Sequence, residues 1–319
     1  MSYSTRIDYI LHLADNALIL GHRNSEWTGH GPILEQDIAL SNIALDLIGQ
    51  ARNFYQYAAR LINETPADQP TQGPGNRFSV QSGSSFPSTL LKAGAEVTED
   101  SLAYLRDGWD YRNCLLAEQA NGDWAKTILR QFFFSAYQFY LYEELQHSQD
   151  TELAAISEKS FKEVSYHLRW SSEWVIRLGD GTAESHNRMG KALGDLWKFT
   201  GELFLPATYE QSLAAEAIAV DLLSIQPKWE EKVREILEEA QFPVLVATPA
   251  AAPSRVISAG TIPGDTIPGA NRRQVDTDRG TEKGPWMQTG GKEGRHTEQL
   301  GYVLAEMQFL QRAYPGCEW

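Results

Sequence analysis

Apolar side chains recur every three or four residues through most of the chain, which predicts helices rather than strands. The clearest stripe follows Pro32 and repeats at alternating intervals of four and three: Leu40, Ala44, Leu47, Ala51, Phe54, Ala58 and Leu61. This spacing lines the apolar side chains along one face of a helix. Pro32 suits a first helical position, and the acidic Glu35 and Asp37 suit the positive end of the helix dipole. The sequence therefore predicts a long amphipathic helix over 34–61.

Similar periodicity predicts the remaining helices, at 4–24, 99–118, 123–147, 151–179, 185–204, 208–218, 228–240 and 296–313. The segment 123–147 is apolar nearly all round, which is typical of a central helix buried by several neighbours. Strand-like runs are short and occur only at Phe242–Val246 and Arg255–Ser258. We expect an all-α fold, an up-down helical bundle with extra C-terminal helices.

Two segments interrupt the helical pattern. Residues 65–93 and 248–285 are rich in Pro, Gly, Ser and Thr and carry no apolar stripe. This composition is typical of long surface loops. Because the helix after 285 is too short to form a domain by itself, we interpret both segments as loop insertions in a single helical domain over 1–319.

Charge and cysteine content narrow the class of protein. The 42 acidic and 28 basic residues give a formal net charge of −14, which disfavours nucleic acid or an anionic membrane surface as a partner. Asp8 and Asp15 interrupt the first apolar stretch, so it resembles neither a signal peptide nor a membrane span. The only cysteines, Cys114 and Cys317, form no disulfide framework and indicate a reducing compartment. We expect a cytoplasmic protein.

A helical bundle with inward polar residues raises the hypothesis of a di-metal carboxylate centre, which uses Glu-x-x-His pairs. Residues three apart share a helix face, so one carboxylate and one imidazole reach the same ions. The sequence contains two such strings, Glu144–His147 at a polar helix end and Glu293–His296 after two glycines. Each is either a metal-ligand pair or a surface pair at a helix end.

The middles of the long helices argue against such a centre. Glu163 and His167 lie near a buried stripe but are four apart, and Val164 stands three before His167. His167 is therefore a candidate ligand or a hydrogen-bonded core histidine. In helix 34–61 the inward face carries Leu47 and Gln50, where a metal-binding bundle needs Glu and His. We expect no oxygen-activating centre in this chain.

Other catalytic motifs are missing. The sequence has no phosphate-binding Gly-x-x-x-x-Gly-Lys-Ser/Thr, no Gly-x-Ser-x-Gly elbow and no Gly-x-Gly-x-x-Gly after a strand. The string TGGKEGRHTE places Lys292, Arg295 and His296 before a predicted helix. These residues form either an anion site at a helix start or a plain turn and cap.

Four strings carry a resemblance to a known family: EWTGHGPILEQDIALSNIALDLIGQARNF (26–54), LLAEQANGDWAKTILRQ (115–131), KEVSYHLRWSSEWVIRLGDGT (162–182) and TGGKEGRHTEQLGYVLAEMQFLQRAYPGCEW (289–319). Together they resemble the non-catalytic, ferritin-like structural subunit of phenylacetyl-CoA 1,2-epoxidase. The resemblance implies a ferritin-like fold and a supporting role beside a homologous catalytic subunit, which holds the di-iron centre and binds the CoA thioester. It also implies a separate NADPH-dependent reductase with flavin and iron–sulfur groups, and no cofactor in this chain.

The same resemblance places Leu47 and Gln50 at the positions of one Glu-x-x-His of the catalytic homologue, and Val164 and His167 at the other. These are the residues of a degenerate metal site. Two alternatives remain open. One is a free-standing di-metal oxidase or ferritin-like metal binder using Glu35, Glu144, His147, Glu163 and His167. The other is a helical binding module without an oxygenase partner.

Overall fold

The protein is described by a computed structural model, which covers residues 3–64, 96–242, 287–315 and 317. Within these ranges every regular element is a helix, so the all-α prediction is confirmed. Both predicted loop insertions, 65–93 and 248–285, lie outside the described residues, as do both strand-like runs apart from Phe242.

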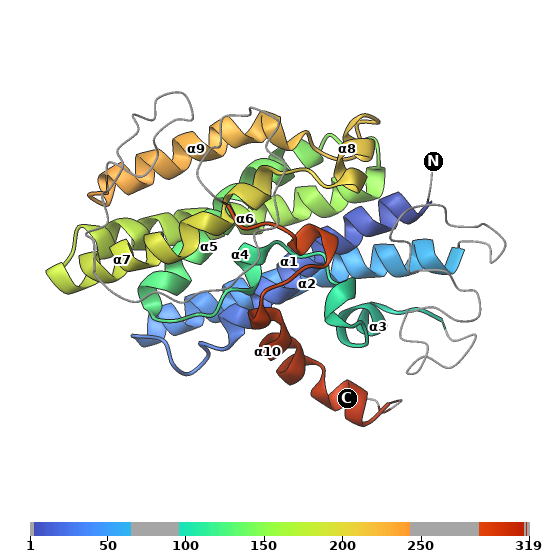
Figure 1. Ribbon diagram of the computed structural model, residues 1–319, viewed down its shortest axis with the longest axis horizontal. Coiled ribbons are helices and arrows are strands. Elements are labelled where there is room, and N and C mark those ends of the chain that lie inside the picture. The colour runs from blue at the N-terminus through green and yellow to red at the C-terminus, as the bar shows by residue number, and fades with distance from the viewer. Residues whose placement is uncertain (1–2, 65–95, 243–286, 316, 318–319) are drawn as a thin grey trace, which may run out of the picture.

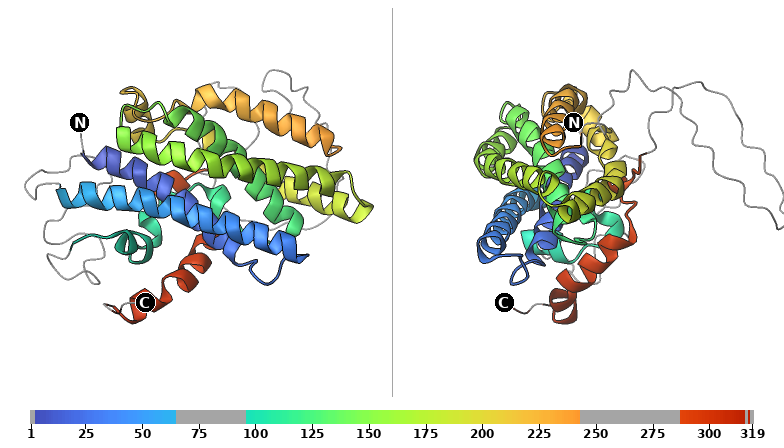
Figure 2. Two further views of the ribbon diagram at one scale, coloured as in Figure 1. Left: turned by 180° about the vertical axis from the view of Figure 1, so that it is seen from behind. Right: turned by 90° about the vertical axis from the view of Figure 1, so that its left-hand side faces the viewer.

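Four long helices form the body of the molecule (Figure 1): α1 (Tyr3–Ser25), α2 (Leu34–Glu64), α5 (Trp124–Leu145) and α6 (Thr151–Gly179). They agree closely with the predictions over 4–24, 34–61, 123–147 and 151–179. The shorter helices are α3 (Glu99–Tyr104), α4 (Leu115–Glu118), α7 (Ala183–Leu196), α8 (Thr208–Ala214), α9 (Leu222–Glu239), α10 (Glu298–Met307) and α11 (Phe309–Ala313). Helices α10 and α11 extend away from the bundle (Figures 1 and 2).

Polar contacts at both ends of α2 and α6 show the relative direction of these two helices. The Asp150 carboxylate accepts hydrogen bonds from the Glu152 and Leu153 amides and so caps the start of α6. It also accepts a bond of 2.6 Å from the Tyr57 hydroxyl, near the end of α2. Near the start of α2, the Gln36 side chain accepts a hydrogen bond of 2.7 Å from the indole N–H of Trp174, near the end of α6. The two helices are therefore antiparallel.

A close approach joins α1 to α2. A Cβ atom on Gly21 would lie 3.3 Å from the Leu47 Cβ and 3.3 Å from the Ala44 carbonyl oxygen. These distances are shorter than most contacts of a Cβ atom, so this glycine serves the close packing of the two helices. The buried apolar residues form one cluster to which all the long helices contribute.

The predicted helix 99–118 is wrong in its middle. Only α3 and α4 are α-helical there, with a 3₁₀ turn at Gly108–Asp110 between them. The reason lies in α1, whose Asp15 carboxylate accepts the Arg112 amide and whose Asn16 side chain accepts the Cys114 amide, each at 2.7 Å. These contacts replace the hydrogen bonds that a continuous helix would have made.

Four other predicted boundaries also need correction. Helix α7 ends at Leu196 and short 3₁₀ turns continue to Phe204, so 185–204 is not one helix, and 296–313 is divided into α10 and α11. Helix α8 ends at Ala214, and Ala217 beyond it has a φ of 55°. Helix α9 begins six residues before the predicted 228, because Asp221 caps it and Pro227 is accommodated inside.

None of the helices in the described part of the chain is long and apolar enough to cross a membrane.

Candidate functional site

The predicted degenerate site lies between α2 and α6, in the middle of the bundle. Leu47 and Gln50 project from α2, Val164 and His167 from α6, and all four are at most 1% exposed. The inward orientation expected from their spacing is therefore correct. All four side chains lie in the packed interior rather than at the surface.

Two polar pairs connect α2 and α6 at this point. The Gln50 Nε2 donates to the Glu163 Oε2 at 2.9 Å. The His167 Nε2 lies 3.0 Å from the Asp46 Oδ2, and because a carboxylate only accepts, the imidazole is the donor. The carboxylate of Glu163 is thus bonded to an amide of the opposite helix, and that of Asp46 to an imidazole of the opposite helix.

The donor set does not fit a di-metal centre. Two buried atoms here, the Gln50 Oε1 and the His167 Nδ1, have no hydrogen-bond partner among the described residues. Leu47 and Val164 offer no donor atom to a metal ion, and a di-metal centre of this kind takes its ligands from Glu and His. In the described ranges no group of three or more His, Cys, Asp or Glu side chains is arranged to hold a metal ion.

The alternative ligands do not gather at one place. Glu35 is exposed at the start of α2, and His147 is exposed beyond the end of α5. Glu144 accepts a bond of 2.8 Å from the Lys228 ammonium on α9. Only Glu163, bonded to Gln50, and His167 lie at the degenerate site.

The residues of the predicted anion site are held by acidic groups of the same chain. The Lys292 ammonium is buried and lies 3.0 Å from the Glu210 Oε2. Arg295 is exposed and pairs with Glu293 at 2.5 Å. His296 lies 2.8 Å from Glu118, so the Glu293–His296 string does not converge on one ion either. This arrangement favours the alternative interpretation, a structural turn.

Besides Glu210, two buried carboxylates hold that turn against the bundle, and sequence reasoning missed all three. Glu202 accepts the Gly290 and Gly291 amides at 2.6 and 2.7 Å, and its other oxygen accepts the Leu115 amide at 2.7 Å. Burial raises the pKa of Glu202, while these three amides lower it. Glu118 accepts the Thr297 amide at 2.7 Å. The sequence gives little indication of these buried carboxylates, because an isolated Glu in a short helix is usually predicted to lie on the surface.

A second buried network lies between α1 and the segment after α3. Arg106 and Asp15 are both fully buried and form an ion pair. The Tyr55 hydroxyl also donates to Asp15, at 2.5 Å. The pair is completed by the Arg112 amide, so the carboxylate has several donors in an apolar setting. This network joins α1 and α2 to the segment after α3.

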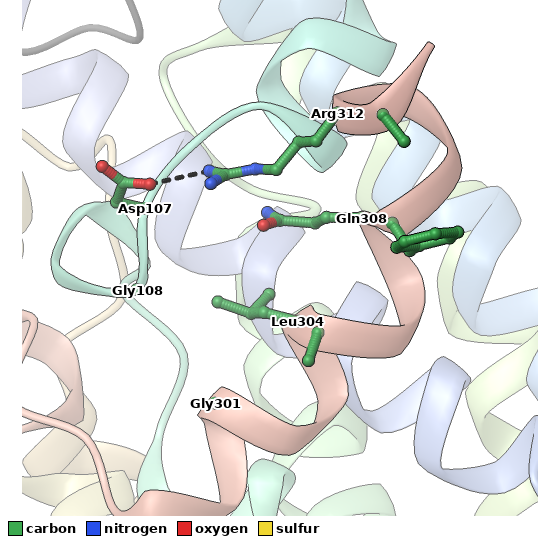
Figure 3. Close-up of a pocket in the computed structure, with 9 residues that line it drawn as sticks. Asp107, Gly108, Gly301, Leu304, Gln308 and Arg312 are labelled. Atoms are coloured by element: carbon green, nitrogen blue, oxygen red, sulfur yellow. Dashed lines mark hydrogen bonds and ion pairs between the residues drawn. The ribbon is translucent and has the colours of Figure 1, made fainter.

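A groove of about 520 Å³ runs between α10–α11 and the 3₁₀ turn at Gly108 (Figure 3). Leu304 and Gly301 line one side, and the Asp107–Arg312 ion pair of 2.7 Å crosses one end. Gln308 points across it and donates to the Arg106 carbonyl oxygen at 2.9 Å. Asp107 and Arg312, which form this ion pair, are the titratable residues of the lining.

The four long helices and the buried core that they share define the chain as a helical-bundle protein. The chain is a member of the phenylacetic acid catabolic protein family, whose sequence pattern matches residues 1–249 and 279–319. The unmatched residues 250–278 fall inside the second predicted insertion. This membership confirms the ferritin-like fold that the resemblance implied.

Comparison with curated proteins identifies a particular relative. Over 311 residues the chain is 39% identical to one of the subunits of 1,2-phenylacetyl-CoA epoxidase from Escherichia coli (strain K12). The alignment covers 98% of this chain and 98% of that relative. The family resemblance predicted from the four sequence strings is thereby confirmed.

Proposed function

We propose that this chain is the structural, non-catalytic subunit of a phenylacetyl-CoA 1,2-epoxidase and supports a homologous di-iron catalytic subunit in aerobic phenylacetate catabolism. The observation that carries the proposal is the pairing of Gln50 with Glu163 and of His167 with Asp46 at the centre of the bundle. These pairs link α2 to α6, and Leu47 packs against α1, so these contacts hold the helices together without a metal ion. The relative's place as one subunit of the epoxidase supports a place for this chain in a hetero-oligomer.

In this proposal the chemistry belongs to other chains. The di-iron centre and the phenylacetyl-CoA site lie in the homologous subunit, and electrons come from a reductase that uses NADPH, flavin and iron–sulfur groups. Phenylacetyl-CoA is a partner of this chain only through the complex, and the chain binds neither nucleic acid nor membrane. Its negative charge supports that exclusion. We place the complex in the cytoplasm.

Reconstitution tests this proposal. The chain, the homologous catalytic subunit and the reductase are purified separately, and phenylacetyl-CoA turnover is measured with each component omitted in turn. We expect turnover only when the catalytic subunit is present and a large loss when this chain is omitted. Turnover by this chain with reductase alone would instead favour the free-standing di-metal oxidase. Full activity without this chain would contradict the proposed supporting role.

A further inference from the structure

His296, which lies two residues before α10, has an oxygen atom beside each of its ring nitrogens. Its Nδ1 lies 2.8 Å from the Glu118 Oε2, and its Nε2 lies 3.0 Å from the Tyr111 carbonyl oxygen. A carbonyl oxygen only accepts hydrogen bonds, as does an ionised carboxylate, whereas a neutral imidazole donates from one nitrogen alone. With Glu118 ionised, both contacts are hydrogen bonds only if the ring is the charged imidazolium.

The surroundings of Glu118 favour the ionised carboxylate. Its Oε2 also accepts the Asn113 side-chain amide at 2.8 Å, and its Oε1 accepts the amide and the hydroxyl of Thr297, each at 2.7 Å. A carboxyl group that accepts several hydrogen bonds is stabilised in its charged form. The shared proton of the pair therefore belongs to His296, whose side chain is 7% exposed beside a Glu118 side chain with no exposure.

The cations around this pair have acceptors of their own. Three of them form ion pairs with other carboxylates at 2.5 to 3.0 Å: Arg23 with Glu26, Arg295 with Glu293, and Lys292 with Glu210. A fourth, Arg112, donates to the Tyr111 carbonyl oxygen at 3.0 Å. His296 is therefore the ion-pair partner of the Glu118 carboxylate.

We infer that His296 is a pH-sensitive latch, which fastens the start of α10 to the bundle as an imidazolium and releases it as a neutral ring. Loss of the proton would leave one ring lone pair facing an oxygen atom, and the buried Glu118 charge without a cation. The same carboxylate holds Thr297, whose side chain caps α10 by accepting the Gln299 amide at 3.3 Å. The start of α10 therefore loosens together with His296. This inference does not depend on the proposed function.

The direction of the pH dependence follows from where the proton is held. Histidine in an unfolded chain loses its proton near pH 6.5. Because the latch needs the charged ring, its contribution is complete below that pH and is lost as pH rises until the folded ring gives up its proton. Helices α10 and α11 extend away from the bundle (Figure 2), and on them Tyr302 and Phe309 are each 62% exposed. The latch thus sets how firmly these aromatic side chains are held in place.

The protonation of the ring is measured by two-bond proton–nitrogen NMR on the full chain labelled with ¹⁵N-histidine. Spectra of the seven histidines are recorded at pH 7.5, and the His296 signal is assigned by its loss in His296→Gln. Hydrogen exchange of the α10 amides, corrected for the intrinsic rate, is then followed from pH 6.5 to 8.5. His186→Gln is the matched control, because among the described residues the His186 ring is hydrogen-bonded at Nδ1 alone, to the Gly179 carbonyl oxygen at 2.7 Å.

We expect both ring nitrogens of His296 to carry a proton at pH 7.5, whereas a neutral ring carries one. In wild type and His186→Gln, the protection of the α10 amides should fall by about fivefold or more from pH 6.5 to 8.5. In His296→Gln it should change by less than about twofold, because the titrating group is gone. If no histidine of wild type has two protonated nitrogens at pH 7.5, the inference is overturned even where His296→Gln fails to fold. An equal fall in protection in His296→Gln would also overturn it.

Discussion

The side-chain amide of Gln50 in α2 donates a hydrogen bond of 2.9 Å to the carboxylate of Glu163 in α6. An amide satisfies this partly buried carboxylate without adding charge, so the pair is stable without a metal ion. The contact links the two antiparallel helices α2 and α6.

The first prediction concerns Gln50→Glu. The new carboxyl group would face Glu163 at hydrogen-bond distance, and two adjacent carboxylates cannot both be ionised at low cost. The new group must bind a proton, so its pKa is raised in the folded state. Its favourable contribution is then present at low pH and lost as pH rises through the raised pKa. We expect the variant's unfolding midpoint to fall below that of wild type at pH 8 and to approach it at pH 5. Equal deficits at both pH values would contradict the pairing.

A second prediction concerns Leu47→Glu. Leu47 is fully buried against Gly21 and Ala44, so the carboxylate would enter a site without a partner. We expect a loss of several kcal/mol in the free energy of unfolding. Leu47→Met, which nearly conserves volume, is expected to cost less than about 1.5 kcal/mol. Denaturant unfolding with and without added iron measures both variants, and rescue of Leu47→Glu by iron would indicate a retained metal site.

The buried ion pair gives a third prediction. Arg106→Met would leave the Asp15 carboxylate buried without its counter-ion, which costs about 3–5 kcal/mol. Arg188→Met, which breaks an exposed pair with Glu184 on α7, is expected to change stability by less than about 1 kcal/mol. Urea unfolding of the two variants checks the contrast. Equal small effects would mean that the Asp15 network contributes little to the fold.

A fourth prediction concerns Asp8 of α1. Burial raises the pKa of this carboxyl group to about 6, against which Arg112 acts weakly. The folded state therefore binds the proton more tightly than the unfolded state, and the contribution of Asp8 to stability falls as pH rises from about 4 to 6. Asp8→Asn removes this titration. Its unfolding midpoint should exceed that of wild type at pH 7.5, and the difference should shrink at pH 4.5. A constant difference would show that Asp8 titrates normally.

Sequence periodicity was sufficient for the long helices, because their stripes extend over many turns and each buried position repeats the same information. Leu47 and His167 were placed correctly for this reason. The segment 99–118 was not, since its structure depends on Asp15 and Asn16, which lie 97 and 98 residues from their partners in the sequence. The local sequence pattern contains no information about such a long-range contact.

The partners of the candidate site were only half predictable. The spacing of Gln50 and His167 showed that both face inward, but their partners depend on the register between α2 and α6, which one sequence does not fix. Lys292 is the opposite case. A lysine in a glycine-rich string suggests an anion site, whereas its ammonium is buried against Glu210. The tertiary fold brings that carboxylate from 82 residues away.

Iron content of the reconstituted complex tests the central claim most directly. The chain and its homologous catalytic subunit are combined in equal amounts, isolated by size exclusion and analysed for iron and protein. Because the described residues of this chain do not bring together the donor set of a di-metal centre, we expect about two iron ions per pair of subunits, all retained by the catalytic subunit after separation. About four per pair, with two remaining on this chain, would contradict the account.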